Sequence, residues 1–171
     1  MSKPTIYAGH HVLLPDTAGQ GVPIYVVGGH DVDAVALNVQ VDEGRGESPR
    51  IELIDVITDT IFAANNTGPR RDLDGSGPED VVPQWEYAGT TTREGYVAAH
   101  GLLATVCVST EGLTAGDYVF RVRGTLNGDT ALGLVPVTLV NGSLRISEHE
   151  DVDGVVCIRN AWRLAKSMSS Q

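Results

Sequence analysis

The strongest constraint in this 171-residue sequence is a run of strict alternation between apolar and polar or small side chains at residues 35–41. Val35, Leu37, Val39 and Val41 alternate with Ala36, Asn38 and Gln40. This period of two is typical of a β-strand with one face in a core and the other toward water. Val, Ile and Thr together supply 44 residues and Gly supplies 20, a composition that favours strands and turns over helices.

Short apolar runs separated by turn residues continue along the chain, which predicts an all-β fold of sandwich type. The expected strands are residues 11–14, 22–27, 35–41, 51–57, 84–88, 95–99, 102–108, 117–122, 135–139 and 142–146. Apolar residues recur at helical spacing only in residues 155–168, so one short amphipathic helix is expected at the C-terminus.

This pattern divides the chain into three parts. Residues 1–10 are expected to be a frayed N-terminus, and residues 11–146 to form the sandwich. Within the sandwich, residues 65–83 are rich in Gly, Pro, Asp and Asn without apolar periodicity, and are expected to form a long acidic surface loop. Residues 147–171 are expected to be a linker followed by the C-terminal amphipathic helix.

Charge and hydropathy exclude two classes of partner. Acidic residues outnumber basic ones by 22 to 12, giving a formal charge of −10, so the phosphate backbone of a nucleic acid would be repelled. No apolar run is long enough to insert into a membrane. Cys107 and Cys157 are too few for a disulfide framework, and the sequence leaves open whether they are free thiols or one bridge.

Several short motifs, in order, resemble the cohesin family and the related sandwiches of carbohydrate-binding modules. An early strand containing proline precedes the long alternating strand, and a G-x-L-A-T-like strand and an a-G-x-Y-like turn follow later. The matching segments are residues 21–26, 35–41, 55–57 with 61–65, 101–106, 115–118 and 141–146. The resemblance covers about residues 11–146, and the loop at residues 65–83 is longer and more acidic than the family pattern.

The resemblance implies a nine-stranded sandwich of jelly-roll topology that carries no catalytic groups. Its flat strand face would bind a protein partner that carries a dockerin module, and the protein would be secreted or located at the cell surface. Asn38 and Gln40 lie on the solvent side of the strand that would belong to this face. They are the candidate partner-binding residues.

Oxygen-bearing side chains in the expected loop suggest a calcium site. The candidate ligands are Asp72, Asp74, Ser76, Glu79 and Asp80, interleaved with glycines that allow the backbone to curl around an ion. A twelve-residue EF-hand loop would end in a bidentate glutamate where this sequence has Pro83. Any calcium bound here would therefore occupy an irregular, structural site, and a solvated acidic turn is the alternative.

The C-terminal segment offers a further possibility. Residues 151–156 and the expected helix after them resemble half of a dockerin repeat, although only Asp151 and Asp153 supply carboxylates. If this tail docked on a neighbouring copy, the protein would be a self-assembling surface or filament subunit. A linker and a helix packed on the sandwich is the alternative.

Enzymatic signatures are missing from the sequence, which contains no nucleophile elbow, no phosphate-binding glycine loop and no zinc-protease motif. Together with the family resemblance, which implies a secreted binding protein, this leads us to expect a non-catalytic extracellular module for binding or assembly. A carbohydrate-binding module is the second interpretation, in which Trp85, Tyr87 and Tyr96 form an exposed aromatic platform for sugar rings.

Overall fold

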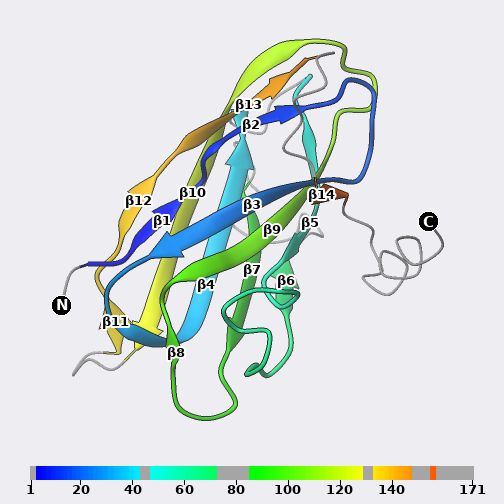
Figure 1. The fold of residues 1–171 in the computed structure, drawn as a ribbon. Coiled ribbons are helices and arrows are strands. Elements are labelled where there is room, and N and C mark those ends of the chain that lie inside the picture. The colour runs from blue at the N-terminus through cyan, green and yellow to red at the C-terminus, as the bar shows by residue number, and fades with distance from the viewer. Residues whose placement is uncertain (1–2, 43–46, 73–84, 129–132, 148–154, 157–171) are drawn as a thin grey trace.

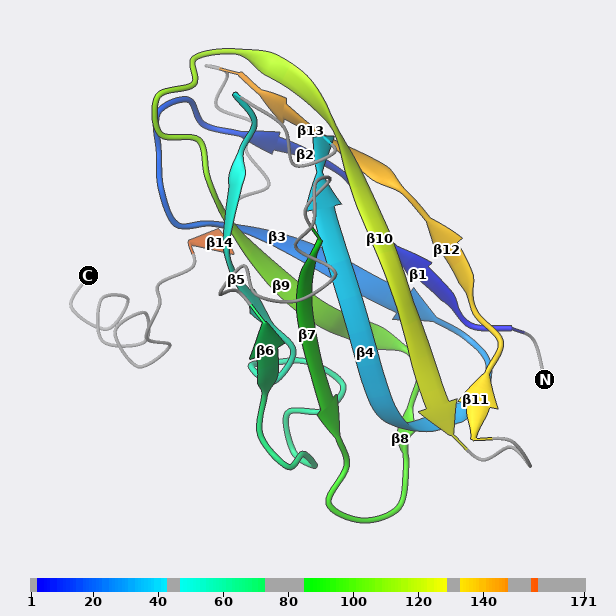
Figure 2. The same ribbon diagram turned by 180° about the vertical axis from the view of Figure 1, so that it is seen from behind.

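The computed structural model describes residues 3–42, 47–72, 85–128, 133–147 and 155–156. These residues form β-strands, turns and irregular segments, and no α-helix occurs among them, so none of their segments is a helix that could span a membrane. The strands build two sheets packed face to face, seen from the two sides in Figures 1 and 2. The expectation of an all-β sandwich is confirmed.

The first sheet faces the viewer in Figure 1 and has six strands. Its order is β12-β1-β3-β9-β5, and β14 pairs with β3 beside this path. The strands are β12 (Thr138–Val140), β1 (Thr5–Tyr7), β3 (Gln20–Val27), β9 (Gly101–Ser109), β5 (Arg50–Asp55) and β14 (Val155–Val156).

The second sheet faces the viewer in Figure 2 and has eight strands. Its order is β2-β13-β10-β4-β7-β6, with β11 paired to β10 and β8 paired to β4. The strands are β2 (His10–Leu13), β13 (Gly142–Ile146), β10 (Gly116–Gly128), β4 (Asp31–Val41), β7 (Glu86–Thr91), β6 (Arg70–Asp72), β11 (Leu134–Val135) and β8 (Val97–Ala98).

The core lies between the sheets and consists of the inward residues of both. On β4, Val35, Leu37 and Val39 are at most 4% exposed, as their alternation predicts. They face the six-stranded sheet, whose inward residues include Ile24 and Val106, both fully buried. Phe62 and Phe120 are the largest fully buried side chains.

Two chain crossings close one side of the sandwich. The chain passes from β1 to β2 at Gly9, and from β12 to β13 at Asn141, so both segments change sheet side by side. Ser143 donates its backbone N–H to the Gly9 carbonyl (3.0 Å). A Cβ at Gly142 would lie 1.7 Å from that carbonyl oxygen, so this crossing requires a glycine at position 142.

The structure corrects the expectation of a frayed N-terminus at residues 1–10. Thr5–Tyr7 form β1, which lies between β12 and β3, and His10 begins β2. Ala8 donates its N–H to the Val140 carbonyl (2.9 Å) and is fully buried. A three-residue strand gives little periodicity, and its pairing depends on β12, far away in the sequence.

Two further expectations change. The loop expected at residues 65–83 is interrupted by strand β6, Arg70–Asp72, which pairs with β7. The expected C-terminal helix is wrong at its first two residues, because Val155 and Val156 form β14 and pair antiparallel with Gly21 and Gln20 of β3. Hydrogen-bonding groups on the edge of β3 support an extended segment there. Residues 157–168 of the expected helix lie outside the described residues.

A candidate protein-binding face

The outer surface of the eight-stranded sheet, called the outer face below, presents alternate residues of β10, β4, β7 and β6. Asn38 is near its centre, because it pairs in register with Arg123 of β10 on one side and Tyr87 of β7 on the other. Asn38 is half-buried, and its side chain makes no hydrogen bond with a described residue. The structure therefore agrees with the expected position of Asn38.

Gln40 does not fit the expectation that it is solvent-exposed. It alternates onto the outer side of β4, opposite Arg121, yet it is only 2% exposed. Its Nε2 is buried and has no hydrogen-bond partner in the described part of the chain. Strand alternation indicates toward which side a residue points, but not whether other chain segments cover it. Gln40 is therefore removed from the set of residues that can contact a partner directly.

Three arginines, Arg70 of β6 and Arg121 and Arg123 of β10, lie on this outer face and are called the basic stripe. Arg121 and Arg123 alternate with Phe120 and Val122, whose side chains are in the core. In a chain with a formal charge of −10, this stripe is a local exception. Because charges act mainly within a Debye length of about 10 Å, these guanidinium groups contribute positive potential locally, at the surface that a docked partner meets.

The aromatic residues proposed as a sugar platform do not form one planar row. The guanidinium of Arg123 lies over the ring of Trp85, 4.7 Å from its centroid, in a cation–π contact that occupies one ring face. Tyr87 is the second residue of β7, and Tyr96 lies beyond the far end of that strand in the turn before β8. Tyr96 is 49% exposed, but it has neither of the other two rings beside it in the strand register.

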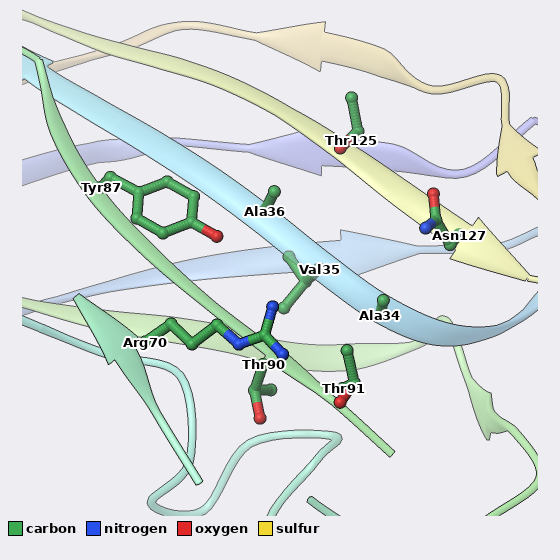
Figure 3. A pocket seen from close by; sticks show the side chains of 9 residues that line it. All are labelled: Ala34, Val35, Ala36, Arg70, Tyr87, Thr90, Thr91, Thr125 and Asn127. Carbon is green, nitrogen blue, oxygen red and sulfur yellow. The ribbon is translucent and has the colours of Figure 1, made fainter. Parts of the chain in front are cut away.

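A hollow in the outer face lies one row from Asn38. Arg70, Gly89, Ala36 and Thr125 form a register row across β6, β7, β4 and β10. The two inner members of this row are small, so the surface sinks between Arg70 and Thr125 into a pocket of about 170 Å³. Its lining residues, shown in Figure 3, are Ala34, Val35, Ala36, Arg70, Tyr87, Thr90, Thr91, Thr125 and Asn127.

Gly89 determines how Tyr87 lines this pocket. A Cβ at residue 89 would lie 2.5 Å from the Tyr87 hydroxyl oxygen and 2.7 Å from the Val35 carbonyl oxygen. The absence of a side chain at Gly89 lets the Tyr87 ring lie along the strand with its hydroxyl over the glycine. Figure 3 shows this hydroxyl and the Arg70 guanidinium both directed toward the middle of the pocket.

Arg145 also lies on the eight-stranded sheet, but its charge is already paired. Its Nε donates to Asp117 Oδ1 at 2.8 Å, and both side chains are largely exposed. This hydrogen bond raises the pKa of the Arg145 guanidinium further above its usual value. Arg70 makes no hydrogen bond or ion pair with any described residue. Arg145 is therefore already paired with a carboxylate, whereas the Arg70 guanidinium has no carboxylate partner among the described residues.

The calcium expectation remains a prediction. Asp74, Ser76, Glu79 and Asp80 lie outside the described residues, and of Asp72 only the backbone in β6 is described. Among the described residues, no three His, Cys, Asp or Glu side chains come together as a metal site. Cys107 is 3% exposed in β9 and is a free thiol, whereas Cys157 falls outside the described part.

Sequence reasoning missed the pocket and the basic stripe. Arg121 and Arg123 were detectable, because two arginines at a spacing of two in a strand share one face. Arg70 was not, because its place beside Gly89 depends on the pairing of β6 with β7. Exposed Tyr7 and Tyr25, paired across β1 and β3 on the other sheet, were also missed.

Comparison with solved structures shows which known proteins share this fold. The chain is similar to a non-cellulosomal cohesin from the hyperthermophilic archaeon Archaeoglobus fulgidus, with a TM-score of 0.64 and 17% identity over 88% of this chain and 95% of that one. It is also similar to a type I cohesin of Clostridium thermocellum solved in complex with a dockerin, with a TM-score of 0.60 and 10% identity over 85% and 100%.

A third similar structure is the sixth cohesin of scaffoldin B from Acetivibrio cellulolyticus, solved in complex with a mutant Cel5 dockerin. Its TM-score is 0.59, at 13% identity over 85% of this chain and 100% of that one. No protein-family model matches the sequence, and no curated protein matches it either. The chain is a β-sandwich with a cohesin-like fold.

Proposed function

We propose that this protein is a non-catalytic binding module that recognises a protein partner bearing a dockerin module through the outer face of its eight-stranded sheet. The proposed site of action is outside the cell or at its surface. The observation that carries the proposal is the exposed face centred on Asn38, with the basic stripe and a pocket beside it. Solved cohesins of the same fold occur in complexes with dockerins, which supports the choice of partner.

The form of the outer face suits a protein better than a small substrate. A pocket of about 170 Å³ is smaller than the roughly 300–1,000 Å³ typical of small-molecule sites. Arginine and tyrosine, which are enriched in the core of protein interfaces, occur together on this face as Arg70, Arg123 and Tyr87. The face therefore offers anchoring residues on a rigid sheet.

Affinity capture tests this proposal. The immobilised full-length chain is incubated with the secreted proteins of the source organism in calcium-containing buffer, and bound proteins are identified by mass spectrometry. We expect retention of a protein that carries a dockerin module, and binding of that isolated module in calorimetry. Capture without any dockerin-bearing protein, or an isolated dockerin that fails to bind, would contradict the proposal.

A further inference from the structure

The pocket on the outer face gathers polar groups that have no hydrogen-bond partner among the described residues. The Arg70 guanidinium, the Tyr87 hydroxyl and the Asn127 amide all belong to its lining and make no hydrogen bond within that part of the chain. Thr125 adds a further hydroxyl, whereas the Thr91 hydroxyl is hydrogen-bonded to that of Thr67 (2.8 Å). Several donors that converge on one small hollow indicate a ligand group that accepts hydrogen bonds.

The charge of the pocket specifies that acceptor. Among the described residues that line the pocket, Arg70 is the one charged residue, and its guanidinium is exposed, without an ion pair to any of them. A guanidinium presents a planar fork of N–H groups that matches a carboxylate and binds it through two parallel hydrogen bonds. A single cation among neutral hydroxyls and an amide suits a ligand group with one negative charge.

The size and position of the pocket specify where the carboxylate comes from. Its volume of about 170 Å³ accommodates one side chain rather than a whole ligand. The row Arg70, Gly89, Ala36 and Thr125 lies next to the row that contains Asn38 and Arg123, so a partner docked over Asn38 covers the pocket mouth. Arg123, in the row that contains Asn38, adds a second positive charge to the same face.

We infer that the pocket is an anchoring subsite that takes the carboxylate of a glutamate or aspartate side chain from the partner protein. This inference rests on the proposed function for the source of the carboxylate. Arg70 binds the carboxylate oxygens, and the Tyr87 hydroxyl donates to one of them. Ala36 and Gly89 keep the pocket open by their small size.

Nuclear magnetic resonance tests the subsite on the isolated full chain. The ¹⁵N-labelled protein is titrated with N-acetyl-glutamate N-methylamide, with the glutamine analogue, and with galacturonate as a sugar acid. We expect saturable shifts at the amides of Ala36, Gly89 and Thr125 with the glutamate probe. The glutamine probe should bind at least about tenfold more weakly than the glutamate probe, because it cannot form the charge-assisted hydrogen bonds with Arg70.

Variants separate the pocket from general charge attraction. Arg70→Gln should abolish the saturable shifts, and Ala36→Leu should do so by filling the pocket while the charge remains. Arg145→Gln is the matched control, since it removes the same charge from the same sheet but leaves the pocket intact, and it should retain the shifts. An unchanged spectrum away from the pocket shows that each variant is folded.

Three results would overturn the inference: no saturable shift with the glutamate probe, equal binding of the glutamine probe, or shifts that persist in Arg70→Gln. Tighter binding of galacturonate than of the glutamate probe would assign the pocket to a sugar acid and equally overturn it. The outcomes are separable from those of affinity capture. A captured dockerin with a silent pocket refutes only the subsite, and a responsive pocket without a captured dockerin refutes only the partner.

Discussion

Replacing Asn38 with tryptophan should weaken binding of the proposed dockerin-bearing partner by about 30-fold or more, measured by calorimetry with the isolated module. Asn38 lies between Arg123 and Tyr87 at the centre of the outer face. A large side chain at this point holds a flat partner surface away from both neighbours and from the pocket. Residues at the centre of an interface carry about 2 kcal/mol or more, which corresponds to roughly that change in affinity.

Thr105→Trp is the matched control for this substitution. Thr105 is a half-buried residue of β9, a central strand of the opposite sheet, and it pairs with Pro23. The same bulk is therefore added to the other side of the sandwich, and affinity should stay within about twofold of the wild type. Equal losses for Thr105→Trp and Asn38→Trp would show that the outer face has no special role.

The second large effect concerns stability. Phe120→Ala should lower the free energy of unfolding by about 3–5 kcal/mol, because it removes a fully buried aromatic side chain and leaves a cavity. The change also removes the edge-to-face contact between Phe120 and His11, whose ring centroids are 6.2 Å apart. Urea unfolding followed by fluorescence should show a lower midpoint with an unchanged slope.

Val119→Thr provides the comparison at the adjacent position. Val119 is 40% exposed on β10 and points away from the core, and threonine keeps its branched shape. Its stability should stay within about 0.5 kcal/mol of the wild type. If Phe120→Ala lowered the free energy of unfolding as little as Val119→Thr, the description of Phe120 as part of the core between the two sheets would be contradicted.

The long strands were predictable because their own sequences carry the signal. Residues 35–41 alternate so regularly that the inward set of β4 follows directly, and burial of Val35, Leu37 and Val39 agrees. The short strands were not predictable in this way. β1, β6 and β14 have two or three residues each, and they are extended because a neighbouring strand supplies hydrogen-bond partners.

The candidate site shows the same division. The outward position of Asn38 could be predicted, because the alternation of its own strand places it there. Gln40 follows the same alternation and is nevertheless buried. Its burial could not be predicted, because the sequence of a single strand does not reveal what covers the outer side of that strand. The pocket could not be foreseen, because Arg70, Gly89, Ala36 and Thr125 come from four strands that meet only in the folded sheet.

The site of partner contact can be measured by cross-saturation between an unlabelled dockerin module and the deuterated, ¹⁵N-labelled chain. Irradiation of the dockerin should reduce signals at the amides of Ala36, Asn38, Tyr87 and Arg123, while Tyr7 and Tyr25 on the opposite sheet keep their intensity. Saturation centred on Tyr7 and Tyr25, with the amides around Asn38 unaffected, would contradict recognition through the outer face.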